Sequence, residues 1–354
     1  MSRKSTSLCS DERVMCIGID VHRKNWRIDV RHDGVSLRKM SVDPSPGVLA
    51  KTVRDLFPSA RFRSVYEAGF SGYWAHRELQ RLGIENMVVN PADVPTTSKE
   101  KDRKDDPIDC GKLSRELNNG SLHGIFVPTP EQEGLRAMSR LLDQQRCSTT
   151  RVKNRVKAHL HFTGASVPSH DEVSHWSRAF ITCLQELELP TEHHKATLDM
   201  HLDELQWLRK RRLDLLRKLR ILSQDIEDIS LLRTVPGIGF ITAITLYAEL
   251  MNMDRFRNND HLASFVGLVP STATSSDKTT TRGMTHRHAK YLRYLLIEAS
   301  WHAIRKDEVL AMSFVELTKR MSKGEAIVRI AKKLLRRIRC VLKDRKPYCT
   351  GMLE

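Results

Sequence analysis

Four acidic residues are the first candidates for chemistry in this 354-residue sequence. Asp20 and Glu67 each end a predicted strand, and Asp106 and Asp109 lie one helical turn apart at the start of a predicted helix. Two like charges at this spacing repel each other unless a cation joins them. Carboxylate oxygens are ligands that Mg²⁺ and Mn²⁺ accept, and paired ions of this kind stabilise the attacking and leaving oxygens at phosphorus. The four acids therefore predict a divalent-metal site for phosphodiester chemistry.

Each acid also has a plain structural explanation. Asp106 would cap its helix and Asp109 would complement the helix dipole, while Asp20 and Glu67 would be surface residues at strand ends. The predicted strand order favours the metal site, because the first and fourth strands lie side by side and their carboxyl ends converge. The helix that begins at Asp106 then brings two more acids to the same point.

The periodicity of apolar residues and the turn residues predict the strands and helices that must position these acids. Apolar and alternating runs predict three strands in an antiparallel meander, with a turn at Asp33-Gly34. Two further strands then alternate with helices, which predicts an α/β domain with a mixed sheet and helices on its faces. The predicted strands lie near residues 14–20, 26–32, 37–42, 62–67 and 84–90, and the helices near 46–57, 73–82 and from 107 onward.

The rest of the chain predicts mainly helical structure. Residues 131–224 contain almost no Gly, and a leucine stripe with a basic face between Leu205 and Ile226 predicts a long helical, coiled-coil connector. After Ile229 the sequence predicts a mainly α domain, with a loop at 271–283 and two closing helices, the last near 324–343. The predicted domains are 1–129, 130–228 and 229–354.

The stretch VPGIGFITA, residues 235–243, predicts a turn between two helices. A Pro-Gly-x-Gly turn exposes backbone N–H groups of Gly237 and Gly239 near the second helix's N-terminus, where a phosphate can bind. The pattern is typical of a helix-hairpin-helix, which contacts DNA without reading its sequence. The alternative is a tight turn that has no ligand.

The stretch STATSSDKTTTRG, residues 271–283, is rich in hydroxyl groups. A serine attacks phosphorus only if its proton is removed and the developing charge is stabilised. Arg282, Arg287, His286 and His288 lie near enough in sequence to serve. On its own the stretch is more typical of a flexible surface loop.

The formal net charge of +16 and a sequence pI near 9.7 predict a polyanionic partner. Aromatic residues make up only 6% of the chain, which favours contact with the phosphate backbone over stacking on bases. The candidates for nucleic-acid contact are Gly237, Gly239, Lys278, Arg282, Arg287, Lys290, Arg293, Lys332, Lys333, Arg336 and Arg337.

Several protein classes are disfavoured by the composition. Seven scattered cysteines without CxxC spacing indicate neither a zinc site nor a disulfide framework. The opening residues lack a signal peptide's apolar core, and no run is long and apolar enough to span a membrane. No GxxxxGK[ST] motif is present to indicate ATP use. We therefore expect a cytoplasmic, nucleoid-associated bacterial protein.

The sequence resembles the DEDD transposases of bacterial insertion sequences, a family that includes the Piv-type DNA invertases and the bridge-RNA-guided recombinases. The resemblance extends over nearly the whole chain in the same order. It rests on IGIDVHRKNW, VYEAGFSGYW, KDDPIDCGKLSREL, LLRTVPGIGFITAITLYAEL and FVGLVPSTATSSDKTTTRGMTHRHAKYLRYLL.

The resemblance implies a RuvC-like, RNase H-fold domain in which Asp20, Glu67, Asp106 and Asp109 bind Mg²⁺. It also implies a C-terminal domain whose serine forms a transient phosphoserine link to DNA. The family usually places glycine directly after this serine, whereas this chain has Ser275-Ser276-Asp277. Counting back from Gly283 makes Ser275 the favoured match, with Ser276 as the alternative. The resemblance further implies a structured guide RNA that pairs with target and donor DNA. It also implies a homo-oligomer, in which dimers assemble to a tetramer and the acids of one chain meet the serine of another.

The sequence thus predicts a Mg²⁺- or Mn²⁺-dependent, RNA-guided DNA recombinase of a mobile element. One alternative is a metal-dependent nuclease or junction resolvase that uses activated water. Another is a nucleic-acid-binding protein without enzymatic activity, in which the acids only structure the first domain.

Overall fold

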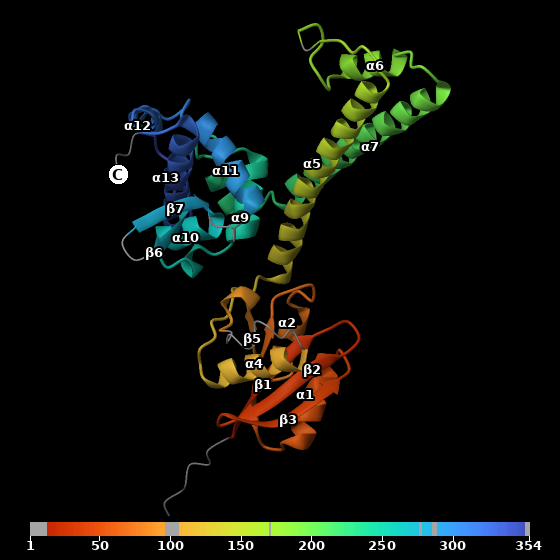
Figure 1. Ribbon diagram of the computed structural model, residues 1–354. Helices are drawn as coiled ribbons and strands as arrows, with labels where there is room; N and C mark the ends of the chain where they lie inside the picture. Colours follow the sequence, from red (N-terminus) through yellow and green to blue (C-terminus); the bar gives the residue numbers. More distant parts are fainter. Residues whose placement is uncertain (1–12, 96–105, 170, 276–277, 285–288, 351–354) are drawn as a thin grey trace, which may run out of the picture. The chain divides into compact units, whose positions relative to one another are not determined.

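The computed structural model describes residues 13–95, 106–169, 171–275, 278–284 and 289–350 (Figure 1). The chain divides into two units, Met1–Val127 and Pro128–Glu354. Each unit has its own hydrophobic cores and is described by itself.

The first unit is built on a five-stranded sheet with the order β3-β2-β1-β4-β5. Strands β1, β2 and β3 form an antiparallel meander, whereas β4 and β5 are parallel to β1. This confirms the predicted mixed sheet of an α/β domain. The elements are β1 (Val14–Val21), β2 (Trp26–His32), β3 (Val35–Val42), α1 (Pro46–Leu56), β4 (Arg61–Glu67), α2 (Trp74–Arg81), β5 (Glu85–Val89), the 3₁₀ turn η1 (Pro91–Asp93) and α4 (Asp106–Asn118).

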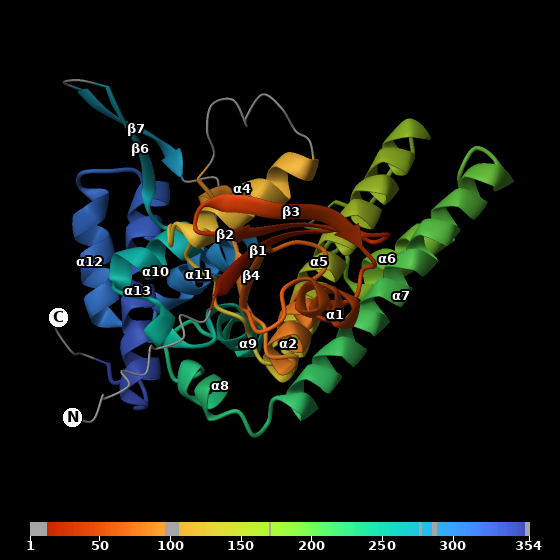
Figure 2. The same cartoon turned by 90° about the horizontal axis from the view of Figure 1, so that it is seen from below.

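The two faces of this sheet are covered by different helices (Figure 2). Ile17 and Ile19 of β1 lie in the core that contains residues of α1 and α2. Cys16 of β1 and Val65 of β4 lie in a smaller core with Leu113 of α4. Because successive strand residues point to opposite faces, the even-numbered positions of β1 face α4.

The second unit begins with two long helices, α5 (Pro130–Phe162) and α7 (Glu192–Leu222), with the short α6 (Arg178–Glu186) between them. They run antiparallel, since Arg155 Nη2 is 2.8 Å from Glu204 and His159 Nε2 is 2.9 Å from the carbonyl oxygen of His194. Apolar residues of both helices form one core. This confirms the predicted long helices.

The remainder of the second unit is mainly helical and shares a core with the base of α5. Along the described stretches of chain, no helix combines the length and the apolar character that a membrane span needs. The elements are α8 (Glu227–Leu232), α9 (Phe240–Leu250), the 3₁₀ turn η2 (Met253–Arg255), α10 (Asn259–Val266), β6 (Pro270–Ser275), β7 (Lys278–Met284), α11 (Lys290–Ala303), α12 (Glu308–Thr318) and α13 (Lys323–Asp344).

Two expectations for this region were wrong. The hydroxyl-rich stretch is not simply a loop, because β6 and β7 pair antiparallel there, with Ser275 opposite Lys278. Its threonines are β-branched, and β-branched residues fit a pleated strand. Three helices rather than two close the chain, because α12 starts separately at its own N-cap residue, Asp307, whose side chain accepts from the amide of Leu310.

Candidate active site

Asp20 and Glu67 lie at the adjacent ends of two parallel strands. Ile19 of β1 is the partner of Tyr66 of β4, so Asp20 and Glu67 are the next positions along these strands. By the alternation of side chains, both project toward the face that α4 covers. Both residues are half-buried. The structure thus brings these two predicted site residues together.

Helix α4 lies directly on β1 beside this pair. A Cβ atom built on Gly18 would lie 2.0 Å from the carbonyl oxygen of Cys110 and 2.5 Å from the amide nitrogen of Ser114. Only glycine permits so close an approach of helix backbone to strand. Since Gly18 is two residues before Asp20, this contact holds the start of α4 close to the candidate acids.

The electrostatics of Glu67 place Asp109 near the same point. Burial raises the pKa of Glu67, and the charges of Asp109 and Asp20 raise it further, while the ammonium group of Lys112 opposes them. Lys112 lies on α4 and is only 8% exposed. Asp20 and Asp109 are therefore close enough to Glu67 to disfavour its ionisation, which is the situation that a bound cation would relieve.

The fit of this site to a divalent ion rests on the chemistry of its donors. Among the residues with described side chains, no group of three or more His, Cys, Asp and Glu forms a ready-made metal site. Asp106 is the first residue of α4, but its side chain is outside the described part. Carboxylate oxygens are nevertheless the donors that Mg²⁺ and Mn²⁺ take. His22 Nε2, 3.0 Å from Asp20 Oδ2, is an additional neighbour.

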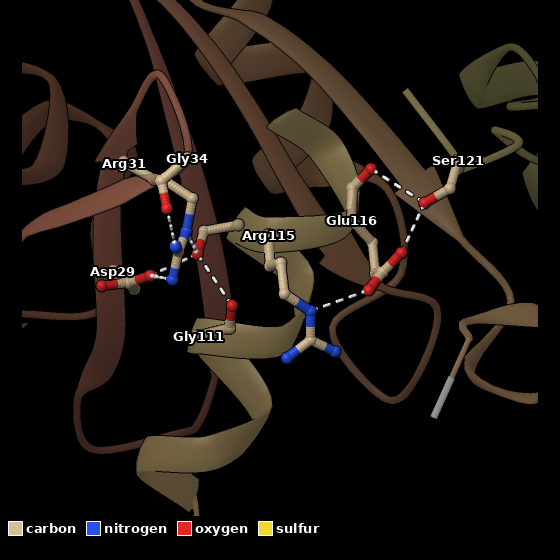
Figure 3. Close-up of polar contacts among 8 residues, drawn as sticks. Asp29, Arg31, Gly34, Gly111, Arg115, Glu116 and Ser121 are labelled. Carbon is tan, nitrogen blue, oxygen red and sulfur yellow. Dashed lines mark hydrogen bonds and ion pairs between the residues drawn. The ribbon is translucent and has the colours of Figure 1, made fainter. Parts of the chain in front are cut away.

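A buried carboxylate, Asp29 of β2, anchors α4 to the sheet (Figure 3). Asp29 pairs across the strands with Gly18 and is fully buried. Its carboxylate accepts hydrogen bonds from the hydroxyls of Ser36 and Ser114, and Arg31 Nη2 is 3.4 Å from Oδ2. Arg31 Nε also donates to Ser114 Oγ at 3.2 Å. This network, which we call the Asp29 cluster, joins β2, β3 and α4.

The other end of α4 is held by Glu116 (Figure 3). Its carboxylate accepts from Ser121 Oγ at 2.6 Å and from Arg115 Nε at 2.9 Å, and it is 8% exposed. These two contacts lie within α4 and the turn that follows it, so it is the Asp29 cluster that joins this helix to the sheet by polar contacts. Such contacts specify one orientation, whereas apolar packing alone tolerates small shifts.

Sequence reasoning missed Gly18, Asp29 and Lys112. The alternation in β2 places Asp29 on its polar side, and a polar side usually faces solvent. In this sheet α4 covers it. The available signal was the presence of an acid and a glycine at central positions of two predicted strands, where both residue types are depleted.

The predicted serine lies at the tip of the β6–β7 hairpin. Ser275 is the last residue of β6 and Lys278 the first of β7, and Arg282 lies further along β7. The side chains of these three residues are not among those described. Ser276 and Arg287 lie outside the described residues altogether.

The predicted helix-hairpin-helix turn connects α8 to α9. Gly239 is the N-cap residue of α9. Gly237 has φ +82°, and a Cβ there would lie 2.2 Å from the carbonyl oxygen of Ala299 in α11. Gly237 is therefore required by packing as well as by turn geometry. Phosphate contact by either glycine stays a prediction.

Three of the predicted basic residues of α13 line one cleft of about 310 Å³, together with residues of α10 and α12. Lys332 contacts Asp260 at 2.8 Å, and Lys333 contacts Ser313 at 2.8 Å. Leu262, Leu317 and Leu335 contribute apolar surface. We call this set the α13 cleft; its basic residues are Arg329, Lys332, Lys333 and Arg336.

Arg337 differs from the other basic residues of α13. Its Nη1 is 3.0 Å from Oδ2 of Asp307, and its side chain is only 11% exposed. It also donates to the hydroxyl of Tyr348. Its role is therefore internal, although its neighbours suit phosphate contact. Lys290 is exposed and Arg293 half-buried, both in the first turns of α11.

Comparison with protein families gives matches in both units. Residues 17–164 match a transposase family model for the DEDD domain of IS110-type elements. Residues 229–316 match the model described as the transposase IS116/IS110/IS902 family. The two matched segments do not overlap and together cover most of the chain. The chain belongs to the IS110 family of transposases. Transposases cut DNA and transfer strands, so this chain is an enzyme.

Individual relatives of this transposase carry the same description. A putative transposase, y4rJ, of Sinorhizobium fredii is 29% identical over 93% of this chain and 92% of its own length. The transposase for insertion sequence element IS1111A of Coxiella burnetii is 24% identical over 80% of this chain and 78% of its own. That for IS1328 of Yersinia enterocolitica is 26% identical over 66% and 68%.

Proposed function

We propose that this transposase is an RNA-guided, site-specific DNA recombinase in which four acids of a RuvC-like, RNase H-fold domain assist a serine nucleophile. The observation that carries the proposal is the convergence of Asp20 and Glu67 on the face covered by α4, where Asp109 raises the pKa of Glu67. Asp106, on the same helix, would complete the set. Their partners would be a structured guide RNA, a target DNA and a donor DNA.

The acids would hold Mg²⁺ or Mn²⁺, which supplies charge stabilisation at the phosphorus and activates oxygen nucleophiles. The serine, Ser275 or Ser276, would attack the scissile phosphorus through Oγ. A bond from Oγ to phosphorus would form and the bond from phosphorus to one sugar oxygen would break. The serine proton would end on that sugar oxygen, which leaves as a hydroxyl group. The phosphoserine link retains the phosphodiester's energy, so religation to a new strand needs no ATP.

The division of labour follows the three segments 1–129, 130–228 and 229–354. The first would hold the acids, the second would join protomers into a dimer that assembles to a tetramer, and the third would hold the serine. The phosphate contacts would come from the α13 cleft, from the turn at Gly237 and Gly239, and from the basic residues around the β6–β7 hairpin. Base pairing by the RNA would leave the protein to read backbone and shape.

A trapping experiment tests the chemistry. Purified protein with its RNA and labelled DNA is incubated with Mg²⁺ and denatured, and label attached to protein is mapped to a peptide. The expected adduct contains Ser275 or Ser276 and disappears in the corresponding Ser→Ala variant, while Ser271→Ala in the same strand serves as the matched control. DNA cleavage that continues without any adduct would instead identify a nuclease that uses water.

A mixing experiment tests the composite site. Asp20→Asn and a Ser275→Ala/Ser276→Ala double variant are each inactive under the proposal, because each lacks one half of the chemistry. Mixed together, they regain cleavage if one chain's acids act with another chain's serine. If the mixture stays inactive although oligomers that contain both variants form, the acids and the serine must act within one chain.

A further inference from the structure

Two tyrosines and an arginine form an aromatic cluster where α5 meets α11. The rings of Tyr291 and Tyr294 are stacked, with centroids 6.4 Å apart and planes inclined by 18°. The guanidinium carbon of Arg146, from α5, lies 5.7 Å from the centroid of Tyr291 and 5.1 Å from that of Tyr294. This spacing is typical of a cation–π contact.

The cluster is preorganised by a neighbouring acid. Arg146 Nε and Nη2 lie 2.9 and 2.7 Å from Oδ1 of Asp143, one turn earlier on α5. The guanidinium is thereby held in place over the rings before any ligand arrives. A fixed aromatic surface loses little conformational entropy when a partner binds it.

Part of the cluster is open to solvent. Tyr294 is 44% exposed, whereas Tyr291 behind it is half-buried. Burial raises the pKa of Tyr291, so this ring is neutral at physiological pH. The exposed tyrosine therefore offers an aromatic surface that is backed by a second ring and a cation.

Positive charge lies beside the exposed ring. Lys290 is four positions before Tyr294 on α11 and is exposed, and Arg293 is adjacent. Residues four apart on a helix share one face. Of the acids nearby, Asp143 pairs with Arg146, and Glu249 of α9 pairs with Arg140 at 2.7 Å. Glu298, four positions after Tyr294, is exposed, and the cations Lys290, Arg293 and Arg146 outnumber it. The local field thus suits a phosphate next to an aromatic surface.

We propose that Tyr294, supported by Tyr291 and Arg146, is a stacking platform for an unpaired nucleobase, with Lys290 and Arg293 contacting the flanking phosphates. A brace between α5 and α11 accounts for the contact of Arg146 with both rings, but not for the 44% exposure of Tyr294. The platform's ligand is a single strand, whether DNA opened for cleavage or an unpaired stretch of RNA. The site is independent of the serine and metal chemistry.

Oligonucleotide binding tests the platform in EDTA, where no strand is cut. Anisotropy with fluorescein-labelled oligothymidine and oligouridine should show binding weakened about tenfold in Tyr294→Ala, the order expected for one lost stacking contact. Tyr294→Phe keeps the ring and should bind like wild type. A loss for oligothymidine alone assigns the platform to DNA, a loss for oligouridine alone to RNA, and a loss for both to either strand.

A stacking signal and a matched control complete the test. A 2-aminopurine base within the preferred oligonucleotide should be quenched by wild type and by Tyr294→Phe, but not by Tyr294→Ala. Trp207 is the control, because it is also exposed and lies 5.0 Å from the guanidinium of Arg211. Unchanged binding by Tyr294→Ala, or an equal loss in Trp207→Ala, would overturn the proposal. Because no cleavage is measured, that failure would leave the proposed function untouched.

Discussion

Both units of the transposase contain a buried carboxylate that joins several elements. In the first unit, Asp29 of β2 accepts from Ser36 of β3 and Ser114 of α4. In the second, Asp307 accepts from the amide of Leu310 in α12 and pairs with Arg337 of α13. Asp29 is fully buried and Asp307 is 2% exposed. A buried charge is tolerated only when it is paired and hydrogen-bonded, as both are.

The two carboxylates differ in what they hold. The Asp29 cluster fixes α4, which carries Asp106 and Asp109. Asp307 caps the start of α12 and pairs with Arg337, whose side chain is therefore buried rather than part of the basic surface of α13. The hairpin that carries the candidate serine is formed by other residues. A buried ion pair therefore serves the candidate site in one unit and only the packing of helices in the other. Damage to the first should change both chemistry and stability, and damage to the second stability alone.

The largest effect is expected for Asp29→Ala. Removing one partner of a buried ion pair typically costs about 3–5 kcal/mol, and we expect this loss in the free energy of unfolding of the first unit. A shift of α4 by about 1 Å would also reduce cleavage roughly 100-fold. Urea denaturation measures the first quantity, and cleavage as a function of Mg²⁺ concentration measures the second.

Asp33→Ala is the matched control for Asp29→Ala. The side chain of Asp33 is 88% exposed, and its contact with His32 is at the surface. The expected change in the free energy of unfolding is about 1 kcal/mol, because Asp33 has a φ of 45° in the turn, where alanine is less favourable than aspartate. Normal Mg²⁺ dependence in an adequately folded Asp29→Ala protein would contradict the positioning role of the Asp29 cluster.

Asp307→Asn should destabilise the second unit by about 2 kcal/mol at neutral pH, the scale of hydrogen bonds to a charged group. Burial alone would raise the pKa of Asp307, but the hydroxyl of Tyr348, the amide of Leu310 and Arg337 together lower it. The unfolded chain therefore takes up the proton first as pH falls, and wild type loses this stabilisation below the ordinary carboxyl pKa.

The pH dependence separates this explanation from a simple loss of packing. The stability difference between wild type and Asp307→Asn should be constant above the ordinary carboxyl pKa and shrink at lower pH. Thermal unfolding across an acid series measures it. A stability difference that does not change with pH would mean that the charge of Asp307 contributes nothing to the stability of the folded protein. A changed Mg²⁺ requirement for cleavage by Asp307→Asn would mean that Asp307, like Asp29, affects the candidate active site.

The two tightly packed glycines give a further contrast. Gly18→Ala should cost about 1–3 kcal/mol through overpacking, because its Cβ would collide with the backbone of α4. Gly237→Ala should cost more, since φ +82° adds strain. In protein that remains folded, only Gly18→Ala should impair cleavage at saturating DNA, whereas Gly237→Ala should act through weaker DNA binding, because Gly237 belongs to the turn proposed to contact phosphates.

Gly239→Ala is the control for both glycines, because a Cβ there meets nothing within 4 Å. Its expected cost is below about 1 kcal/mol. Thermal unfolding and cleavage rates are compared for all three variants. Equal losses of cleavage at saturating DNA from Gly18→Ala and Gly237→Ala would show that the contact of Gly18 with α4 has no particular role in catalysis.

The smallest effects are expected in the α13 cleft. Lys332→Ala and Arg336→Ala should each weaken DNA binding by less than about tenfold. Each should also reduce the magnitude of the slope of log affinity against log salt concentration by about one. Lys319→Ala, on α12 and paired with Glu316, is the control and should leave the slope unchanged. An unaltered salt slope in both cleft variants would exclude direct phosphate contact there.

The sequence by itself determined where most elements lie and how the first sheet is ordered. The apolar run of β1, the alternation in β2 and the turn at Asp33-Gly34 are local signals, and local signals predict local structure. They also placed Asp20 and Glu67 at neighbouring strand ends. The same signals failed for the β6–β7 hairpin, where hydroxyl-rich composition suggested a loop and β-branched threonines formed strands.

Only the tertiary structure decided which polar residues are buried and which partners they meet. Asp29 lies on the polar side of its strand, but α4 covers that side and buries it. Arg337 lies among exposed basic residues of α13, but its side chain is buried because it pairs with Asp307. Arg146 meets Tyr291 and Tyr294 from far away in the chain. Periodicity encodes the side of an element on which a residue lies, but the neighbour on that side depends on how distant elements pack, which local sequence does not contain.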